Sequence, residues 1–135
     1  MAAPTASPLL TIARSFEADL NDHDLDRVVD CFTDDAIVTF IPSPPPTLPR
    51  QVQGKAHIRL VADRLMEGFT MASSDYALGD GQVTLEARVS ADSLRSLGII
   101  EAVDVTAEVA VDNGKVSAFT VIFSSDAAQR IHESV

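Results

Sequence analysis

A cluster of prolines in the first half of the chain constrains the fold more than any other feature. Five of the seven prolines stand close together, at Pro42, Pro44, Pro45, Pro46 and Pro49. Each ring fixes φ and removes a backbone donor, so neither a helix nor a central strand can continue through this segment. Ala36 to Ile41 before it predicts a short β-branched strand, and Gly54 after it opens a helix. We therefore expect a stiff loop at the place where a cone-shaped α+β domain has the mouth of its pocket.

Two helices are expected before the proline cluster. Residues 8–21 carry apolar side chains at helical spacing, namely Leu9, Ile12, Ala13, Phe16 and Leu20. Asp24 can cap a shorter second helix that ends at Phe32, and Asp34-Asp35 then turn the chain into the strand. These helices are expected to pack together.

Strands dominate the sequence after a third helix, which runs from Lys55 until Gly68 ends it. The expected strands cover residues 70–78, 82–90, 101–112 and 115–124. The last two form a hairpin, because Asn113-Gly114 supplies the two positive-φ residues of a type I′ turn. One helical turn is expected over 92–98, and Ser125 or Asp126 can cap a final short helix.

This order of elements predicts the α+β class, with three N-terminal helices packed into a curved, mostly antiparallel sheet. A length of 135 residues suits one domain, which we assign to residues 8–135 after a flexible tail at residues 1–7.

Charge and composition argue against several functions. A formal net charge of −10 disfavours binding to nucleic acid or to an anionic membrane, because both need a basic surface. The single cysteine, Cys31, cannot form an internal disulfide, and no neighbouring residues have the spacing of a metal site. We expect neither a metal nor another cofactor. No apolar run has the length of a signal peptide or a membrane span, which favours the cytoplasm.

A family resemblance rests on three stretches of the sequence. They are LNDHDLDRVVDCFTDDAIVTF at residues 20–40, the helix opened by Gly54, and NGKVSAFTVIF at residues 113–123. With the order of elements, they resemble the NTF2-like superfamily, which includes the SnoaL-like proteins, the ketosteroid isomerases and the limonene-epoxide hydrolases. The proline segment resembles the pocket loop of these hydrolases. The resemblance covers nearly the whole chain and implies a cone-shaped fold, which hosts enzymes, binding proteins and assembly modules alike.

The resemblance also implies where catalytic groups would stand. The tyrosine and two aspartates of the isomerases fall on Phe16, Phe40 and the segment 105–107. The aspartate, arginine and second aspartate of the hydrolases, with their two water-orienting residues, fall on Val121, Ala87, Val89, Val38 and Phe40. Removing a positioned base typically forfeits about 10² to 10⁴ in rate, so apolar residues at these positions argue against both reactions.

Alternation along the strands predicts which side chains face the interior. In residues 82–90 the odd positions are apolar and the even ones polar, and residues 101–112 follow the same rule. Arg88 should then pair with Asp104 or Glu108 on the outside. The expected ligand-binding residues are Phe16, Phe40, Leu65, Phe69, Tyr76, Leu85, Ala87, Val89, Val105, Phe119, Val121 and Phe123. Such an interior is either a filled core or an apolar pocket.

Three polar positions have both a functional and a structural interpretation. Tyr76 could orient a ligand, but a strand tyrosine at an edge with its hydroxyl in water is the favoured reading. His57 could shuttle protons, yet a solvated histidine at a helix start is the simpler prediction. Asp34-Asp35 could form an acid–base pair, and their place in a turn favours solvated carboxylates.

Three functions remain as hypotheses. The leading one is a small hydrophobic molecule of terpenoid or steroid size bound in the cone. The second is a SnoaL-like enzyme of the epoxide hydrolase, isomerase or cyclase type, acting by confinement or through an interior cluster if the strand parity is inverted. That cluster would be Glu86, Arg88, Asp104 and Glu108. The third is a dimeric assembly module with a filled core.

A homodimer is expected through the sheet. The outer side of the last strand would carry Val116, Ala118, Thr120 and Ile122, which are far less polar than an outer face in water should be. A two-fold contact with Ile122 near the axis would cover this face.

Overall fold

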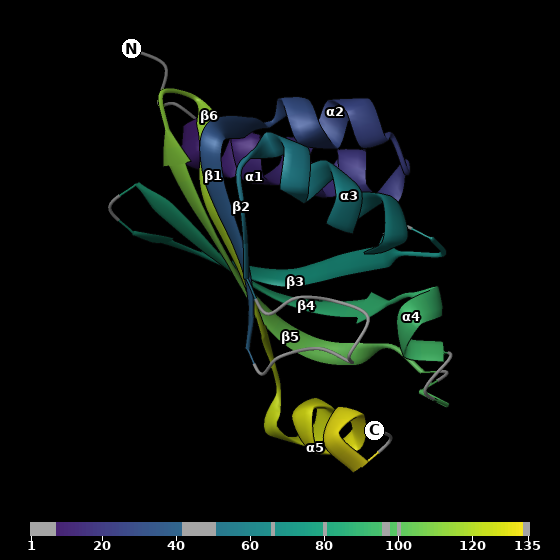
Figure 1. Cartoon of the computed structure of the whole chain (residues 1–135). Coiled ribbons are helices and arrows are strands. Elements are labelled where there is room, and N and C mark those ends of the chain that lie inside the picture. Colours follow the sequence, from purple (N-terminus) through teal and green to yellow (C-terminus); the bar gives the residue numbers. More distant parts are fainter. Residues whose placement is uncertain are drawn as a thin grey trace.

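One curved sheet wrapped around three helices dominates the fold (Figure 1). The computed structural model describes residues 8–41, 51–65, 67–79, 81–95, 98–99 and 101–133. Its helices are α1 (Pro8–Asn21), α2 (Leu25–Asp30), α3 (Lys55–Leu65), α4 (Asp92–Arg95) and α5 (Ser125–Glu133). Its strands are β1 (Phe32–Ile41), β2 (Gln51–Gln53), β3 (Thr70–Gly79), β4 (Gln82–Ser90), β5 (Val103–Asp112) and β6 (Lys115–Phe123). This architecture confirms the predicted α+β class.

The sheet has the strand order β2-β1-β6-β5-β4-β3. Its neighbours are antiparallel except for β1 and β6, which run parallel in the middle of the sheet. Helix α1 packs against β3, β4 and β5, whereas α3 packs against β1 and β2. The apolar stripes of these helices therefore meet the concave face of the sheet. None of the helices within the described ranges is long and apolar enough to cross a membrane.

The structure confirms a predicted helix cap, a predicted turn and the bounds of a predicted strand. Asp24 caps α2, and its side chain accepts a hydrogen bond from the Arg27 backbone N–H. The Asn113-Gly114 turn has φ values of 52° and 78°, as a type I′ hairpin requires. The boundaries of β4 coincide with the predicted strand over residues 82–90.

The predicted end of the second helix and the turn after it are wrong. Helix α2 ends at Asp30, and Phe32 already belongs to β1 with only 2% of its surface exposed. Asp34 and Asp35 lie within β1, where the register against β6 shifts between Phe32 and Ile37. This irregularity accommodates the extra residues as a bulge, which the apolar spacing of 25–32 did not reveal.

Smaller corrections concern the loop and the last helix. Gln51–Gln53, expected to continue the loop, forms β2 and pairs with β1. Ser124, rather than Ser125 or Asp126, caps α5, since its Oγ accepts a hydrogen bond from the Ala127 N–H at 3.1 Å. The predicted tail at 1–7 and the proline loop at 42–50 lie outside the described residues.

The predicted strand parity is confirmed on β4 and β5. The odd-numbered side chains of both strands are buried up to Val109, whereas Glu86 and Arg88 are exposed and Glu108 is half-buried. Arg88 Nε donates to Asp104 Oδ1 at 3.1 Å on the outer face. Val116 departs from the prediction, because it is fully buried instead of lying on the outer side of β6. A register shift between Ala110 and Val111 reverses the orientation of the residues near the hairpin.

Candidate functional site

A cavity of about 90 Å³ lies between the helices and the concave face of the sheet. All of its described lining residues are apolar. They are Phe16, Leu20, Val28, Phe32, Val38, Phe40, Val52, Ile58, Val61, Ala62, Phe69, Met71, Val89, Ala91, Val105, Ala107, Phe119, Val121 and Phe123. Such walls offer shape and apolar contact, and we expect a space lined in this way to be dry.

Most of the predicted ligand-binding residues come together in this lining. Phe16 projects from α1 and Phe69 from the connection before β3, and strands supply the remaining ones, Phe40, Val89, Val105, Phe119, Val121 and Phe123. The side chain of Leu65 lies outside the described residues.

Three predicted positions do not reach the cavity. Leu85 and Ala87 are buried on β4, a strand that packs against α1, and they are not among the residues that line the cavity. Tyr76 is half-buried on the edge strand β3, with the Arg14 guanidinium 5.1 Å from its ring centroid. The cavity thus occupies only part of the interior side of the sheet, and Leu85 and Ala87 belong to the packed core.

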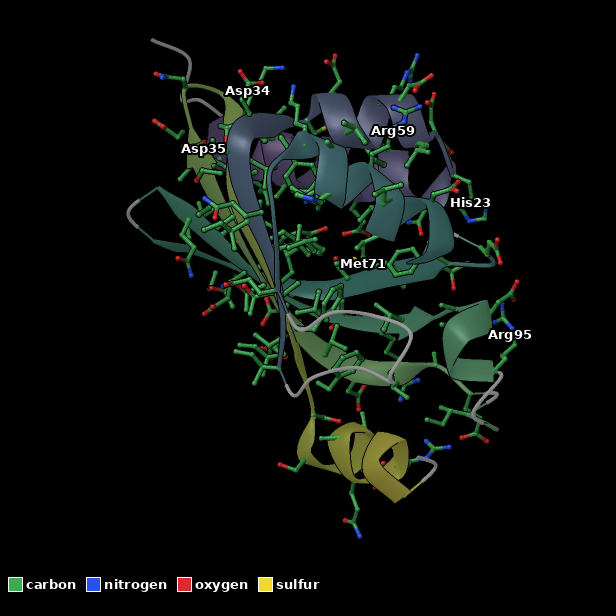
Figure 2. The ribbon with its side chains drawn as sticks, in the orientation of Figure 1. His23, Asp34, Asp35, Arg59, Met71 and Arg95 are labelled. Atoms are coloured by element: carbon green, nitrogen blue, oxygen red, sulfur yellow. The ribbon has the colours of Figure 1, made fainter. Side chains whose placement is uncertain are left out.

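Sequence reasoning missed other lining residues. Helix α3 supplies Ile58, Val61 and Ala62, whose spacing places them on one face of a helix. Met71 carried no comparable signal, because the residues of β3 do not alternate cleanly between polar and apolar. Its position on the cavity wall emerges only when α1 and β3 are placed together; Figure 2 shows it between α3 and the sheet.

Three phenylalanine rings in edge-to-face contact stand in the cavity wall. The Phe16 ring makes edge-to-face contacts with Phe32, at a centroid distance of 5.3 Å, and with Phe119, at 4.9 Å. This volume of 90 Å³ is of the same order as the roughly 150 Å³ that holds benzene in an engineered protein cavity, so one small ring is the largest occupant that it suits. A terpenoid or steroid, as expected from the sequence, exceeds the space between these walls.

The positions that correspond to catalytic groups in the resembled enzymes are hydrocarbon here. Val38, Phe40, Val89, Val105 and Val121 all line the cavity. In the described part of the chain, no lining residue carries a charge, a hydroxyl or an imidazole. The interior acid–base cluster that an inverted strand parity would create is also excluded, because Glu86, Arg88 and Asp104 are exposed on the outer face.

The other polar candidates lie away from the cavity. Figure 2 shows Asp34 and Asp35 at one end of the cone, directed outward, and both are exposed. Asp34 Oδ1 is 3.7 Å from Lys55 Nζ, and Thr33 Oγ1 donates to Asp35 Oδ1 at 3.1 Å. His57 is exposed, with Nδ1 3.0 Å from the Gln53 carbonyl oxygen. Across the described ranges, no group of three His, Cys, Asp or Glu residues is arranged to hold a metal ion.

Among the described residues, Cys31 is the one group with a clearly shifted pKa. Burial, followed by the Asp19 carboxylate, whose Oδ2 accepts from the thiol at 3.3 Å, raises the Cys31 pKa from 9.0 to about 11. The thiol is therefore protonated and unreactive at neutral pH.

Comparisons with known proteins support the same fold. A family model described as a SnoaL-like domain matches residues 12–119. No curated protein matches the chain.

Solved structures are similar over most of their length. A computationally designed 17-OHP binder is 16% identical, with 91% of this chain and 95% of that chain covered and a TM-score of 0.75. An LEH-like epoxide hydrolase from M. tuberculosis is 16% identical, with coverages of 97% and 94% and a TM-score of 0.70. TerC, co-crystallised with polyporic acid, is 20% identical, with coverages of 94% and 99% and a TM-score of 0.69. Identities this low establish a shared fold, and function has to be argued from the cavity.

Proposed function

The chain belongs to the SnoaL-like family, and we propose that it binds a small, uncharged, hydrophobic molecule in the cavity of its cone. The observation that carries this proposal is a cavity in which every described lining residue is apolar. Of the similar structures, one is a 17-OHP binder and another holds polyporic acid, which supports a ligand role for the cone of this fold.

The cavity wall defines the chemistry of the ligand. A charged or strongly polar group would lose its hydration without gaining a hydrogen bond, at a cost of roughly 2 to 7 kcal/mol. A hydrocarbon gains about 0.8 kcal/mol for each buried carbon, so a seven-carbon ring compound such as toluene gains roughly 5 to 6 kcal/mol. This corresponds to a dissociation constant on the order of 0.1 mM.

Thermal unfolding with simple probes tests this proposal. Toluene at about ten times its dissociation constant should add roughly 1.4 kcal/mol of stability, equivalent to a few degrees in Tm. Benzoate, which has a ring of the same size and a charge, should give no shift. If neither toluene nor cyclohexane raises the Tm, the cavity binds nothing and the chain serves as a scaffold.

A matched pair of variants localises the effect. Val121 lines the cavity, whereas Val109, which is also buried and lies on the neighbouring strand, does not. Replacing either by Thr buries a hydroxyl and lowers the stability of the unliganded protein. Only Val121→Thr should also weaken toluene binding.

We further propose a two-fold homodimer through the outer face of β6. Ile122 lies beside Ile41 in the β1–β6 register, and Ile41 is 39% exposed. Ala118 and Thr120 continue this weakly polar strip, while Val116 is excluded from it by its burial. A second copy placed on this strip would remove these side chains from water. A cytoplasmic location accompanies the proposal, as expected from the sequence.

A further inference from the structure

The cavity reaches solvent at only a few of its lining residues. Among the described ones, Val52, Val61, Phe69 and Phe123 are half-buried, whereas the others are buried. Val52 and Phe123 are held within the sheet, and Val61 is held within α3. Phe69 differs from them because it lies in the connection between α3 and β3.

Polar contacts from two directions hold this connection, residues 67–71, which we call the strap. On one side, His23 Nε2 lies 2.6 Å from the Phe69 carbonyl oxygen. Next to it, the Asn21 side chain donates to the Met71 carbonyl oxygen at 2.8 Å and accepts from the Met71 N–H at 2.7 Å. The end of α1 and the turn after it thereby fix the edge of β3.

The other side of the strap is fixed by α4. Arg95 Nη2 donates to the Gly68 carbonyl oxygen at 3.0 Å, and the Asp92 N–H donates to the Glu67 carbonyl oxygen at 3.0 Å. The Arg95 guanidinium is held in turn by the Asp92 carboxylate and by Ser90 Oγ, at 2.8 Å. Figure 2 shows His23 and Arg95 at the same end of the cone, above and below the strap in this view.

Gly68 is required for this arrangement. Its φ of +64° is in the left-handed region, and a Cβ at this position would collide with the Arg95 guanidinium and the Asp92 carboxylate. The contacts hold the strap by its main chain and leave the Phe69 and Met71 side chains facing the cavity. Small movements of the strap therefore translate into movements of the Phe69 ring at the rim.

We propose that Phe69 limits the size and the exchange rate of the ligand, and that Arg95 and His23 are its positioning residues. This inference rests on the proposed function, because it assigns the selectivity of the same cavity. The residues act at different levels: Phe69 contacts the ligand, and Arg95 and His23 act through the carbonyl groups of the strap.

A size series tests the role of Phe69. Benzene, toluene, p-xylene and p-cymene are titrated by thermal unfolding and by ligand-detected NMR. The wild type should prefer the smaller rings, and Phe69→Ala should shift the preference toward p-cymene by roughly tenfold in relative affinity. Tyr76→Ala removes a ring outside the cavity and should leave the order of affinities unchanged.

Exchange kinetics test the positioning residues. Arg95→Gln should raise the dissociation rate of toluene, measured by NMR exchange, roughly tenfold with little change in Tm. Arg88→Gln is the matched control, because it removes an exposed arginine whose ion pair with Asp104 lies on the outer face. Gly68→Ala should reproduce the fast exchange. Gly114→Ala, at φ +78° with no atom within 4 Å of its Cβ, is the control, because it introduces comparable backbone strain in the β5–β6 hairpin, away from the strap.

The possible outcomes separate the two proposals. Toluene binding with an unchanged size order in Phe69→Ala would overturn the inference and leave the proposed function standing. A lower Tm with unaltered exchange in Arg95→Gln would reduce Arg95 to a structural residue and overturn its positioning role. If none of the four probes stabilises either the wild type or Phe69→Ala, both proposals are overturned together.

Discussion

Truncating Phe40 should destabilise the protein less than truncating Phe16, although both rings are buried and line the cavity. Phe40 is 5% exposed and Phe16 is 2% exposed, so the loss of apolar burial is similar. Phe→Ala changes in cores cost about 3 to 5 kcal/mol, and a side chain that borders an existing void lies at the low end of this range. We expect about 3 kcal/mol for Phe40→Ala.

Phe16→Ala loses more because of its ring contacts. Its edge-to-face pairs with Phe32 and Phe119 each contribute about 0.5 to 1.5 kcal/mol beyond burial, so the two together add about 1 to 3 kcal/mol. Within the described part of the chain, Phe40 makes no such contact. Phe16→Ala should therefore cost about 1 to 3 kcal/mol more than Phe40→Ala.

Urea unfolding followed by circular dichroism measures this difference, provided that the slopes of the two transitions agree. The midpoints then report stability directly. Equal losses of unfolding free energy in the two variants would refute the reasoning. They would mean that the ring contacts of Phe16 contribute nothing beyond burial, or that the cavity at Phe40 is closed in solution.

Three further predictions follow from the site and the surface. The purified protein should neither hydrolyse limonene epoxide nor isomerise a Δ5-ketosteroid above a heat-inactivated control, because apolar side chains stand at the corresponding positions; turnover abolished by a cavity variant would contradict this. Light scattering at tens of micromolar should give a dimer for the wild type and a monomer for Ile122→Asp, and a wild-type monomer would count against the interface. With a Cys31 pKa of about 11 against the ordinary 9.0, alkylation by iodoacetamide at pH 8 should be roughly 10 to 100 times slower in the folded than in the urea-unfolded protein, and Asp19→Asn should narrow the gap. Because the folded state keeps this proton longer than the unfolded state, the thiol's contribution to stability is complete below pH 9 and is lost as pH rises toward 11.

Local chemistry in the sequence was sufficient for the main elements and for the sidedness of the sheet. Alternation in residues 82–90 specified both the limits of β4 and its buried face, because a strand exposes successive side chains to opposite sides. Asn113-Gly114 specified the hairpin, since few other pairs adopt two consecutive positive φ values. The resemblance of residues 20–40 and 113–123 pointed to a group that includes the SnoaL-like proteins, and a SnoaL-like family model matches residues 12–119.

The positions of the β-bulges could not be predicted from local sequence patterns. An unbroken alternation along β6 would place Val116 on the outer face. The register shift between Ala110 and Val111 places it in the core instead. Phe32 was assigned to a helix for the same reason, because its spacing fits either element. A bulge depends on the partner strand, and pairing is a property of residues far apart in the sequence.

The sequence by itself determined an apolar interior and an acidic, polar exterior, because the period of each element sorts side chains between the two. Only the tertiary structure decided how that interior is used. Leu85 and Ala87 are buried in the core, whereas Phe40, Val121 and the contacting rings of Phe16, Phe32 and Phe119 line a cavity of about 90 Å³. The strap is likewise held by contacts between residues that are 25 to 50 positions apart. The volume of the cavity and the access to it depend on how separate elements pack in three dimensions. The pattern of residues along the sequence does not specify the distances between those elements.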